Sequence, residues 1–235
     1  KDKKRRKFRA LSHVTFDCRP GEIFGLLGPN GAGKTTTLRI ISTALKPSEG
    51  TAEVNGHDVQ RDATAVRRSI GFLSTNTGLY GRLTPRETLT YFGRLYRIPD
   101  PTIRDRISEL GLRFAMTEFL DRPCDALSTG MKQKVNLTRA VLHDPPVMIF
   151  DEPTNGLDVL TSRIIIDFIR DCKHQGKTVL FSTHIMSEVG KLCDQVGMIH
   201  QGRLVYVGTV DEVRALHGDD LDDAFARILE HGGEA

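Results

Sequence analysis

Short apolar runs of strand length alternate along this chain with longer segments in which apolar residues recur at the spacing of one helix face. The runs that predict strands lie at 22–27, 51–55, 70–73, 147–151, 177–182, 195–200 and 203–207. The segments that predict helices begin at about 34 and 86, and cover 102–110, 129–143, 160–174 and 186–193. This alternation predicts a layered α/β domain with a mainly helical insert.

Individual positions sharpen the pattern. The first predicted helix, from about Lys34, carries Leu38, Ile41 and Leu45 on one face. The run 147–151 is apolar on both faces, which is typical of a strand buried in a parallel sheet. The last two apolar runs are joined by a short Gln-Gly turn and predict a hairpin.

Charge is concentrated at the two ends of the chain. The formal net charge is +3, of which residues 1–9 carry +6 and residues 218–235 carry −5, so residues 10–217 carry +2. A nearly neutral body argues against an extended basic groove for nucleic acid. The basic run predicts either a solvated tail or attraction to anionic lipid head groups. Segment 219–231 predicts a short amphipathic helix packed on the body or on a twin subunit.

Cysteine usage and hydropathy exclude several classes of protein. The four cysteines are far apart and form no CxxC pair, which favours a reducing, cytosolic setting and indicates no zinc site. No apolar run approaches the ~18 residues of a membrane span, and no signal peptide is recognisable. The chain is predicted to be soluble, and its 235 residues are enough for a proper core.

The strongest chemical signal is a complete GxxxxGK[ST] motif between a predicted strand and a predicted helix. Glycines let the backbone wrap closely around phosphates with its N–H groups pointing inward, and the helix N-terminus adds partial positive charge. Lys34 is predicted to reach the β and γ phosphates and Thr35 to hold Mg²⁺. The residues assigned to nucleotide binding here are Gly28, Pro29, Asn30, Gly31, Ala32, Gly33, Lys34, Thr35 and Thr36.

A second signal is an acidic pair, Asp151-Glu152, at the end of the apolar run 147–151. This position puts a carboxylate at the carboxyl edge of a parallel sheet, beside the phosphate loop. Asp151 suits a Mg²⁺ contact through water, and Glu152 suits the role of general base toward the attacking water. Taken alone, such a pair is more often a solvated turn, but the phosphate loop reverses that interpretation.

Three further segments complete a recognisable set. LSTGM at 127–131 opens a predicted helix, with Ser128 as a suitable N-cap. TNGLD at 154–158 follows the acidic pair, and STH at 182–184 ends the next predicted strand. In order and spacing these segments resemble the signature, D-loop and switch histidine of the ABC ATPase family, across roughly residues 10–208.

The resemblance implies a fold and a division of the chain. The fold would be an α/β phosphate-loop NTPase (RecA-like) core with an antiparallel β part and a helical insert. The implied parts are residues 1–75 with the phosphate loop, a helical subdomain at 76–142 ending in the signature helix, residues 143–217, and a short acidic helix at 218–235.

The resemblance also implies an ATP-hydrolysing subunit whose ligands are ATP and Mg²⁺. Two such domains, a homodimer in the simplest case, would pair head to tail. The Lys34 loop of one copy and Ser128, Thr129 and Gly130 of the other would then sandwich each nucleotide. His184 would contact the γ-phosphate, making Glu152, His184 and Lys34 the catalytic set. The partner would be a separate transmembrane permease, with this subunit peripheral on the cytoplasmic face of a bacterial inner membrane and its insert, around 76–100, taking the permease's coupling helix.

Three departures from the family pattern stand out. Thr129 and Met131 differ from the common signature LSGGQ. Thr75 occupies the position of a glutamine that approaches Mg²⁺, and its hydroxyl has a shorter reach, so Asn76 or a bridging water is expected to substitute in part. The family's first strand and the aromatic that stacks on adenine are expected to be missing or in an atypical loop, since Phe8 lies too near Ala10.

Several functions remain open at this point. The run IGFLSTNTGLYGRLTPRETL and the tail LDDAFARIL look most like bacterial export ATPases of the sodium-extrusion type. A soluble ABC ATPase without a transport role, or an ATP-gated clamp with weak hydrolysis, are the alternatives. A phosphate-loop kinase or GTPase is a further alternative, but it would give no role to Asp158, His184 and the signature segment, whose presence would then be coincidental.

Overall fold

The computed structural model describes residues 9–74, 77–218 and 220–231. Its strands are β1 (Ile23–Leu27), β2 (Glu53–Val54), β3 (His57–Asp58), β4 (Ile70–Ser74), β5 (Val147–Asp151), β6 (Thr178–Thr183), β7 (Gln195–His200) and β8 (Arg203–Thr209). Its helices are α1 (Lys34–Ile41), α2 (Ala63–Ser69), α3 (Pro85–Leu95), α4 (Asp100–Arg113), the 3₁₀ turn η1 (Cys124–Ala126), α5 (Thr129–Val141), α6 (Val159–His174), α7 (Met186–Leu192), α8 (Val210–His217) and α9 (Leu221–His231).

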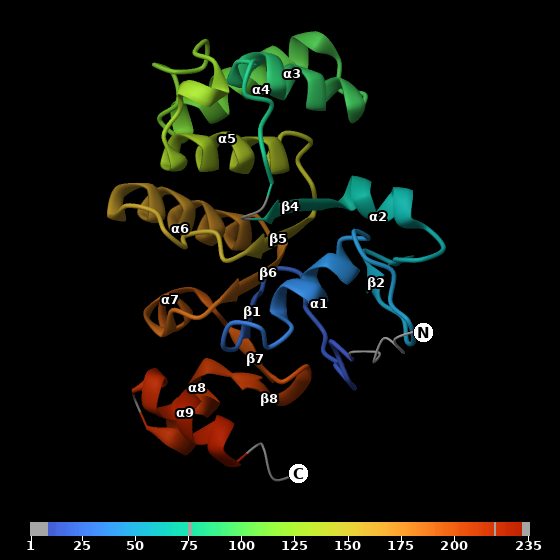
Figure 1. Ribbon diagram of the computed structural model, residues 1–235, viewed down its shortest axis with the longest axis vertical. Coiled ribbons are helices and arrows are strands. Elements are labelled where there is room, and N and C mark those ends of the chain that lie inside the picture. Colours follow the sequence, from blue (N-terminus) through green and yellow to red (C-terminus); the bar gives the residue numbers. More distant parts are fainter. Residues whose placement is uncertain (1–8, 75–76, 219, 232–235) are drawn as a thin grey trace, which may run out of the picture.

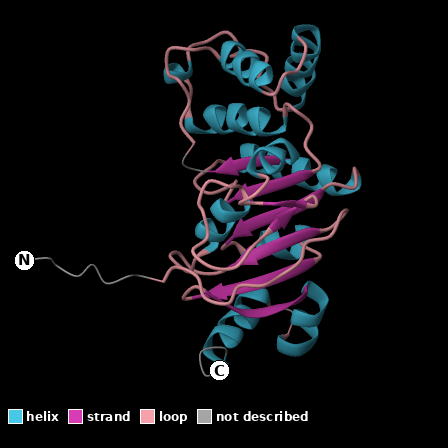
Figure 2. Cartoon of the chain, turned by 90° about the vertical axis from the view of Figure 1, so that its right-hand side faces the viewer, coloured by secondary structure: helices cyan, strands magenta, loops and turns pink. Residues whose placement is uncertain are grey.

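A mixed sheet runs through the middle of the molecule (Figure 1). Within the described residues it has six strands in the order β4-β5-β6-β1-β7-β8, and only β8 runs antiparallel to its neighbour. Because the other five strands are parallel, their carboxyl ends meet at one edge of the sheet (Figure 2). At this edge Asp151 is in register with Ser182 on one side and Ser74 on the other.

Alternate side chains of the central strands enter two different cores. Met148 and Phe150 of β5 join a core with α6 and the helical insert, while Ile149 joins a core with α1 and α2. Along β6, Phe181 and Leu180 divide between the same two cores. Both faces of the sheet are therefore covered, which explains why its parallel strands are apolar throughout.

The helical insert lies between β4 and β5 and consists of α3, α4 and α5 (Figure 2). Helix α3 begins with a capping box, in which the Thr84 hydroxyl accepts from the Glu87 backbone and the Glu87 carboxylate accepts from the Thr84 backbone. Helix α4 begins at Asp100, two residues before the start after Pro101 that the sequence predicted. A proline in the first turn loses no helical hydrogen bond, and the helix tolerates it there.

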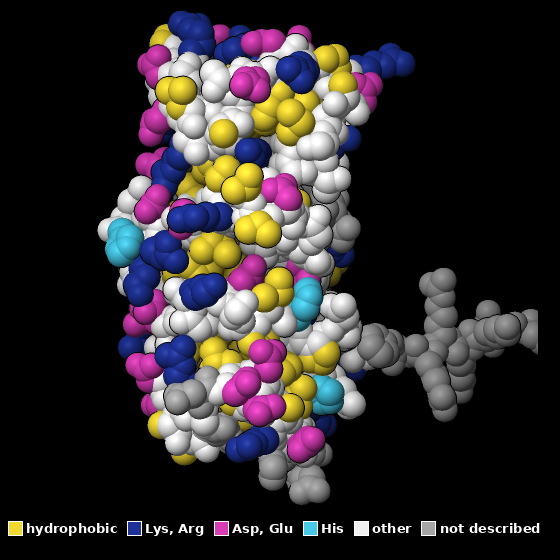
Figure 3. Space-filling model, turned by 90° about the vertical axis from the view of Figure 1, so that its left-hand side faces the viewer, with side chains coloured by type: hydrophobic (Ala, Val, Ile, Leu, Met, Phe, Trp, Pro, Cys, Tyr) yellow, Lys and Arg dark blue, Asp and Glu magenta, His cyan; other side chains and the backbone are white. Residues whose placement is uncertain are grey.

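The C-terminal helices pack on the sheet beside β7. Ala224 and Ile228 of α9 are buried in a third core with α7, α8 and β7. The prediction that the acidic segment forms an amphipathic helix packed on the body is confirmed. Its acidic residues remain exposed, and the face of the molecule in Figure 3 shows side chains of both signs interspersed.

The prediction that Leu45 shares a helix face with Leu38 was wrong. Helix α1 ends at Ile41, Thr43 has a left-handed φ of 64°, and Leu45 is 43% exposed. The left-handed residue reverses the chain, so the helical spacing stops before Leu45 is reached.

In the described residues no strand precedes β1. Residues 12–18 nevertheless alternate in exposure like a strand, with Val14 and Phe16 turned toward the core around α1. The Phe16 ring stacks on Phe24, with the centroids 4.8 Å apart. This segment therefore packs over the sheet, and its Ser12 N–H donates to the Gly202 carbonyl in the turn between β7 and β8 at 2.7 Å. Phe8 lies outside the described residues.

None of the helices in the described residues is long and apolar enough to cross a membrane.

Candidate functional site

The loop between β1 and α1 depends on glycine at two positions. A Cβ on Gly28 would lie 2.3 Å from the Ile199 carbonyl oxygen, and one on Gly33 would lie 2.7 Å from the Leu11 side chain. Gly33 also has a φ of 117°, which L side chains rarely adopt. The loop is thus a tight backbone cradle that leads directly into the N-terminus of α1.

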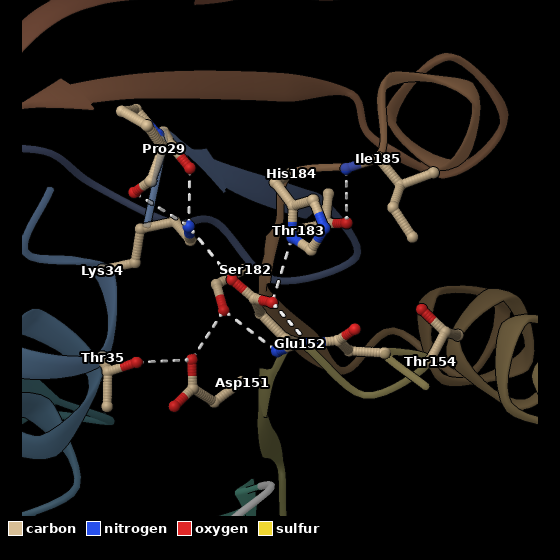
Figure 4. A network of polar contacts seen from close by, with 12 residues as sticks. Pro29, Lys34, Thr35, Asp151, Glu152, Thr154, Ser182, Thr183, His184 and Ile185 are labelled. Carbon is tan, nitrogen blue, oxygen red and sulfur yellow. Dashed lines mark hydrogen bonds and ion pairs between the residues drawn. The ribbon is translucent and has the colours of Figure 1, made fainter. Parts of the chain in front are cut away.

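Lys34 turns back over this cradle from the first position of α1. Its side chain is 4% exposed, and its Nζ donates to the carbonyl oxygens of Gly28 at 2.6 Å and Pro29 at 3.4 Å. The same Nζ lies 3.0 Å from Glu152 Oε1 (Figure 4). The ammonium group is therefore held at the centre of the site and is directed at the loop that would hold phosphates.

The ends of β5 and β6 supply a second set of oxygens. Asp151 is 2% exposed, and its Oδ1 accepts from Thr35 Oγ1 at 3.2 Å and from Ser182 Oγ at 2.8 Å. Thr35 is on α1, so this carboxylate links the phosphate loop to two strands of the sheet. Sequence reasoning missed Ser182 as a partner, although it lies one residue before the end of β6, directly opposite Asp151.

Glu152 is held at the centre of a network (Figure 4). Its backbone has a left-handed φ of 48°, and its N–H donates to both the carbonyl and the hydroxyl of Ser182 at 3.1 Å. Its Oε2 lies 3.0 Å from His184 Nδ1 and accepts from Asn155 Nδ2 at 3.2 Å. Lys34, Glu152 and His184, named separately from the sequence, are thus brought into one chain of contacts.

The donor set fits a magnesium-bound triphosphate. A cradle that excludes Cβ atoms suits close approach of the backbone to phosphate, and Lys34 supplies the countercharge. The hydroxyl of Thr35 and the carboxylate of Asp151 are the oxygen ligands that Mg²⁺ prefers. No group of three His, Cys, Asp or Glu in the described chain could hold a metal alone, so a Mg²⁺ ion here would share its coordination with phosphates.

The signature segment lies apart from the phosphate loop. Ser128 caps α5 by accepting from the Met131 N–H at 3.3 Å, and Ser128 and Thr129 are exposed. A Cβ on Gly130 would lie 3.1 Å from Thr161 Oγ1 and 3.4 Å from Asp158 Oδ2, at the start of α6. No hydrogen bond or ion pair within residues 9–74, 77–218 and 220–231 joins the signature segment to the phosphate loop.

The D-loop segment links the two regions. Asp158 caps α6 by accepting from the Thr161 backbone at 2.9 Å and from its hydroxyl at 2.8 Å, and these hydrogen bonds hold the pKa of Asp158 below its usual value. Gln133 of α5 donates to the Pro153 carbonyl at 3.1 Å, and Asn136 donates to the Thr77 carbonyl at 3.0 Å. Helix α5 is thereby tied to the segments that follow β5 and β4.

Two of the predicted positions lie outside the described residues. They are Thr75, expected at the metal, and Asn76, expected to assist it.

The hydrogen bonds of Asn136 and Gln133 were not predicted from the sequence. A polar residue on the buried side of a helix gives no indication of which backbone carbonyl its side chain will contact.

Comparison with known proteins bears on this site. A model of the ABC transporter family matches residues 11–155. The ABC transporter ATP-binding protein NatA of Bacillus subtilis (strain 168) is 43% identical over 231 residues, which cover 97% of this chain and 94% of that protein. The daunorubicin resistance ATP-binding protein DrrA3 of Streptomyces coeruleorubidus is 37% identical over 227 residues, which cover 97% of this chain and 72% of that protein.

Solved structures agree with this result. An ATP-binding subunit of an ABC transporter superposes with a TM-score of 0.87 at 32% identity, covering 94% of this chain and 93% of that one. The ATP-binding cassette MJ0796, solved as a dimer in a post-hydrolysis state with ADP and Pi, gives a TM-score of 0.78 at 27% identity, covering 86% of this chain and 90% of that one.

The fold and the site define a phosphate-loop nucleotide-binding protein, as expected from the sequence. Within that class, the chain belongs to the ABC transporter ATPase family and is an ATP-binding, ATP-hydrolysing domain of that family.

Proposed function

We propose that this chain is the ATP-hydrolysing subunit of a bacterial exporter and that it acts as a dimer on a separate transmembrane permease. The observation that carries the proposal is the convergence of Lys34, Thr35, Asp151, Glu152 and His184 at the carboxyl edge of one parallel sheet. Three contacts link these residues directly, and two of them, Lys34–Glu152 and Glu152–His184, join groups assigned to hydrolysis.

Each residue has a role that follows from its chemistry. Lys34 neutralises charge on the β and γ phosphates, and the loop N–H groups bind the remaining oxygens. Glu152 accepts a proton from the attacking water, while His184 orients this carboxylate and contacts the γ-phosphate. Thr35 and Asp151 would hold Mg²⁺, which supplies charge neutralisation between the phosphates.

The signature segment belongs to a composite site in this proposal. Its exposed helix start suits the phosphates of a nucleotide that is bound to another copy. Nearby, Val159 and Leu160 at the start of α6 are 82% and 75% exposed. Two apolar side chains so exposed beside the D-loop suit burial against a twin subunit.

A groove beside the C-terminal part of α5, at Arg139 and Ala140, suits contact with the permease. It is open, has a volume of about 210 Å³, and is lined by Arg67, Phe72, Phe92, Tyr96 and Arg139, among others. The Arg139 guanidinium lies 4.9 Å from the centre of the Phe92 ring, so the groove offers aromatic surface and positive charge together. We propose that residues 76–142 form a subdomain that takes the permease's coupling helix here, which places the subunit on the cytoplasmic face of the membrane.

The proposed cargo is a cation, with sodium the first choice. The support is the 43% identity to NatA over nearly the whole of both chains and the resemblance already seen in the sequence. The similarity to a daunorubicin resistance protein makes drug export the competing cargo.

Hydrolysis is tested with the full chain, Mg²⁺ and ATP. Glu152→Gln removes the base and keeps the shape, so turnover should fall about 100-fold or more while ATP still binds. Glu118→Gln, an exposed glutamate of the insert, is the matched control and should leave turnover unchanged. Equal turnover for wild type and Glu152→Gln would support the ATP-gated clamp instead.

Transport is tested with the permease that co-purifies with this chain, reconstituted in vesicles. ATP-dependent movement of sodium supports cation export, and movement of daunorubicin without sodium supports the competing cargo. If no membrane protein co-purifies, a soluble ATPase without a transport role is the better description.

A further inference from the structure

A buried carboxylate lies behind the catalytic pair and has no part in the roles assigned so far. Glu188 is in the first turn of α7, and only 7% of its surface is exposed. Its Oε1 accepts from Thr154 Oγ1 at 2.7 Å, and its Oε2 accepts from Thr183 Oγ1 at 3.0 Å. Both threonines are buried as well, at 6% and 2% exposed.

The two threonines flank the two residues that meet at the site. Thr154 follows Glu152 by two positions, and Thr183 directly precedes His184 (Figure 4). The Thr183 hydroxyl also accepts from the Ile185 N–H at 3.0 Å, so the backbone on both sides of His184 is fixed. The contacts close a ring, from Glu152 through Thr154, Glu188 and Thr183 to His184 and back.

The ring adds side-chain contacts between two segments whose backbones are already joined by the hydrogen bonds from the Glu152 N–H to Ser182. Glu152 follows β5 and has a strained φ of 48°, while His184 follows β6 and is 41% exposed. The 3.0 Å contact between His184 Nδ1 and Glu152 Oε2 therefore depends on the relative position of two loops. A single carboxylate that accepts from both loops sets this position, since each of its oxygens holds one hydroxyl.

We propose that Glu188 is a positioning residue for ATP hydrolysis, holding Glu152 and His184 in register through Thr154 and Thr183. The inference rests on the proposed function, in which those two residues act on the attacking water and the γ-phosphate. In this role the Glu188 carboxylate must accept a proton from each of the two threonine hydroxyls. The Thr183 oxygen already accepts from Ile185, so its proton is directed at Glu188.

The test compares steady-state turnover and ATP affinity of the full chain. Glu188→Ala should lower kcat about 10- to 100-fold, because small errors in the position of a catalytic group cost this much, and the KM for ATP should change less than about threefold. Glu188→Gln retains one acceptor and should fall between wild type and alanine. Thr154→Val and Thr183→Val should each reproduce part of the loss.

Thr88→Val is the matched control for the loss of a buried hydroxyl. Thr88 is fully buried in α3, away from the site, and the hydrogen-bond partner of its hydroxyl within the described part of the chain is the weak one, Cys124 Sγ, at 4.0 Å. Its turnover should equal that of wild type. If Glu188→Ala keeps wild-type kcat, or if kcat falls only in proportion to folded protein measured by thermal unfolding, the proposal is overturned.

A double variant gives a readout that simple destabilisation would not move. In single-turnover measurements the loss caused by Glu188→Ala should be clearly smaller when Glu152 is already Gln, because part of the effect of Glu188 passes through that residue. A further loss of the full size would show that Glu188 acts elsewhere. Wild-type turnover by Glu152→Gln alone would defeat the proposed function and this inference together, whereas loss in Glu152→Gln without loss in Glu188→Ala defeats only the inference.

Discussion

The sheet edge and the signature helix carry the two halves of the proposed nucleotide-binding residues, and these halves are held in different ways. At the sheet edge, side chains from α1, β5 and the end of β6 contact one another, and Lys34 and Asp151 are almost fully buried. At the start of α5, Ser128 and Thr129 are exposed, and the segment's own contacts are a helix cap and the D-loop beside Gly130.

This difference separates two requirements of the reaction, binding of ATP by one chain and completion of the site by a second molecule. The sheet edge is complete within one chain, so binding of the triphosphate should depend on this chain alone. Ser128 and Thr129 of the signature segment are exposed and, within the described part of the chain, form no hydrogen bond with the phosphate loop, so the contribution of this segment should require another molecule. Binding and hydrolysis should therefore respond differently to substitutions in the two regions.

The largest effect is expected at the sheet edge. Lys34→Met removes the buried charge that faces the phosphate cradle, and turnover should fall about 100-fold, with weaker ATP binding. Fluorescent-nucleotide titration and phosphate release measure the two quantities. Arg97→Met, at an exposed position in the turn after α3, is the control and should change neither. Unchanged affinity in Lys34→Met would show that the loop holds nucleotide without its lysine.

A smaller effect of a different kind is expected at the signature helix. Gly130→Ala places a Cβ 3.1 Å from Thr161 Oγ1 and 3.4 Å from Asp158 Oδ2, so these side chains at the start of α6 must give way by a few tenths of an ångström. Turnover should fall about tenfold while the ATP affinity of the monomer stays the same, since only the composite site is affected. ATP-dependent dimerisation, measured by light scattering in the Glu152→Gln background, should weaken in parallel.

Gly78→Ala serves as the control for that experiment. A Cβ on Gly78 meets nothing within 4 Å, so dimerisation and turnover should both be retained. If Gly130→Ala weakens ATP binding by the monomer as much as it lowers turnover, the two regions are not independent and the comparison fails.

The smallest effect is expected on stability rather than on turnover, and it comes from His143, which lies outside both the sheet edge and the signature helix. The ring of His143 stacks on Tyr96 at 3.7 Å, and its Nε2 lies 2.9 Å from the Ile70 carbonyl. Its buried Nδ1 has no hydrogen-bond partner among the described residues. Burial lowers the pKa of His143 to about 4, so the folded protein holds it neutral where the unfolded chain, with a pKa near the ordinary 6.5, takes up a proton.

Stability should therefore fall as the pH is lowered from 6.5 toward 4, because the unfolded state then binds more protons than the folded state. Between pH 7 and 5.5 the free energy of unfolding should drop by about 1 kcal/mol more in wild type than in His143→Phe, which keeps the ring stack. Urea titrations at both pH values measure this. His174→Gln, at an exposed position, should retain the wild-type dependence.

Local patterns were enough to identify most of the sheet edge. The phosphate loop, the acidic pair after β5 and His184 after β6 are each marked by a motif, and a parallel sheet necessarily brings such positions to one edge. The partners between them are not local. Ser182 meets Asp151 only because β5 and β6 are neighbours in this register, and strand order cannot be read from either strand alone.

Other features depended on where the chain turns. Leu45 has helical spacing, yet the left-handed Thr43 ends the helix first. Helix α2 is short and polar, so its sequence carries no clear period, and it was missed. Glu188 in the sequence is one acidic residue among many, and only the packing of α7 against two strand ends reveals that its carboxylate is buried between two hydroxyls.

Parallel strands also give the molecule an electrical polarity. Helices α1, α5 and α6 each begin at the edge where the strands end, so the positive ends of their backbone dipoles lie on the same side. Each contributes about half an elementary charge at its N-terminus. A highly charged anion is thus drawn toward one side of the protein by peptide groups that no titration would detect, although residues 10–217 carry a net charge of only +2.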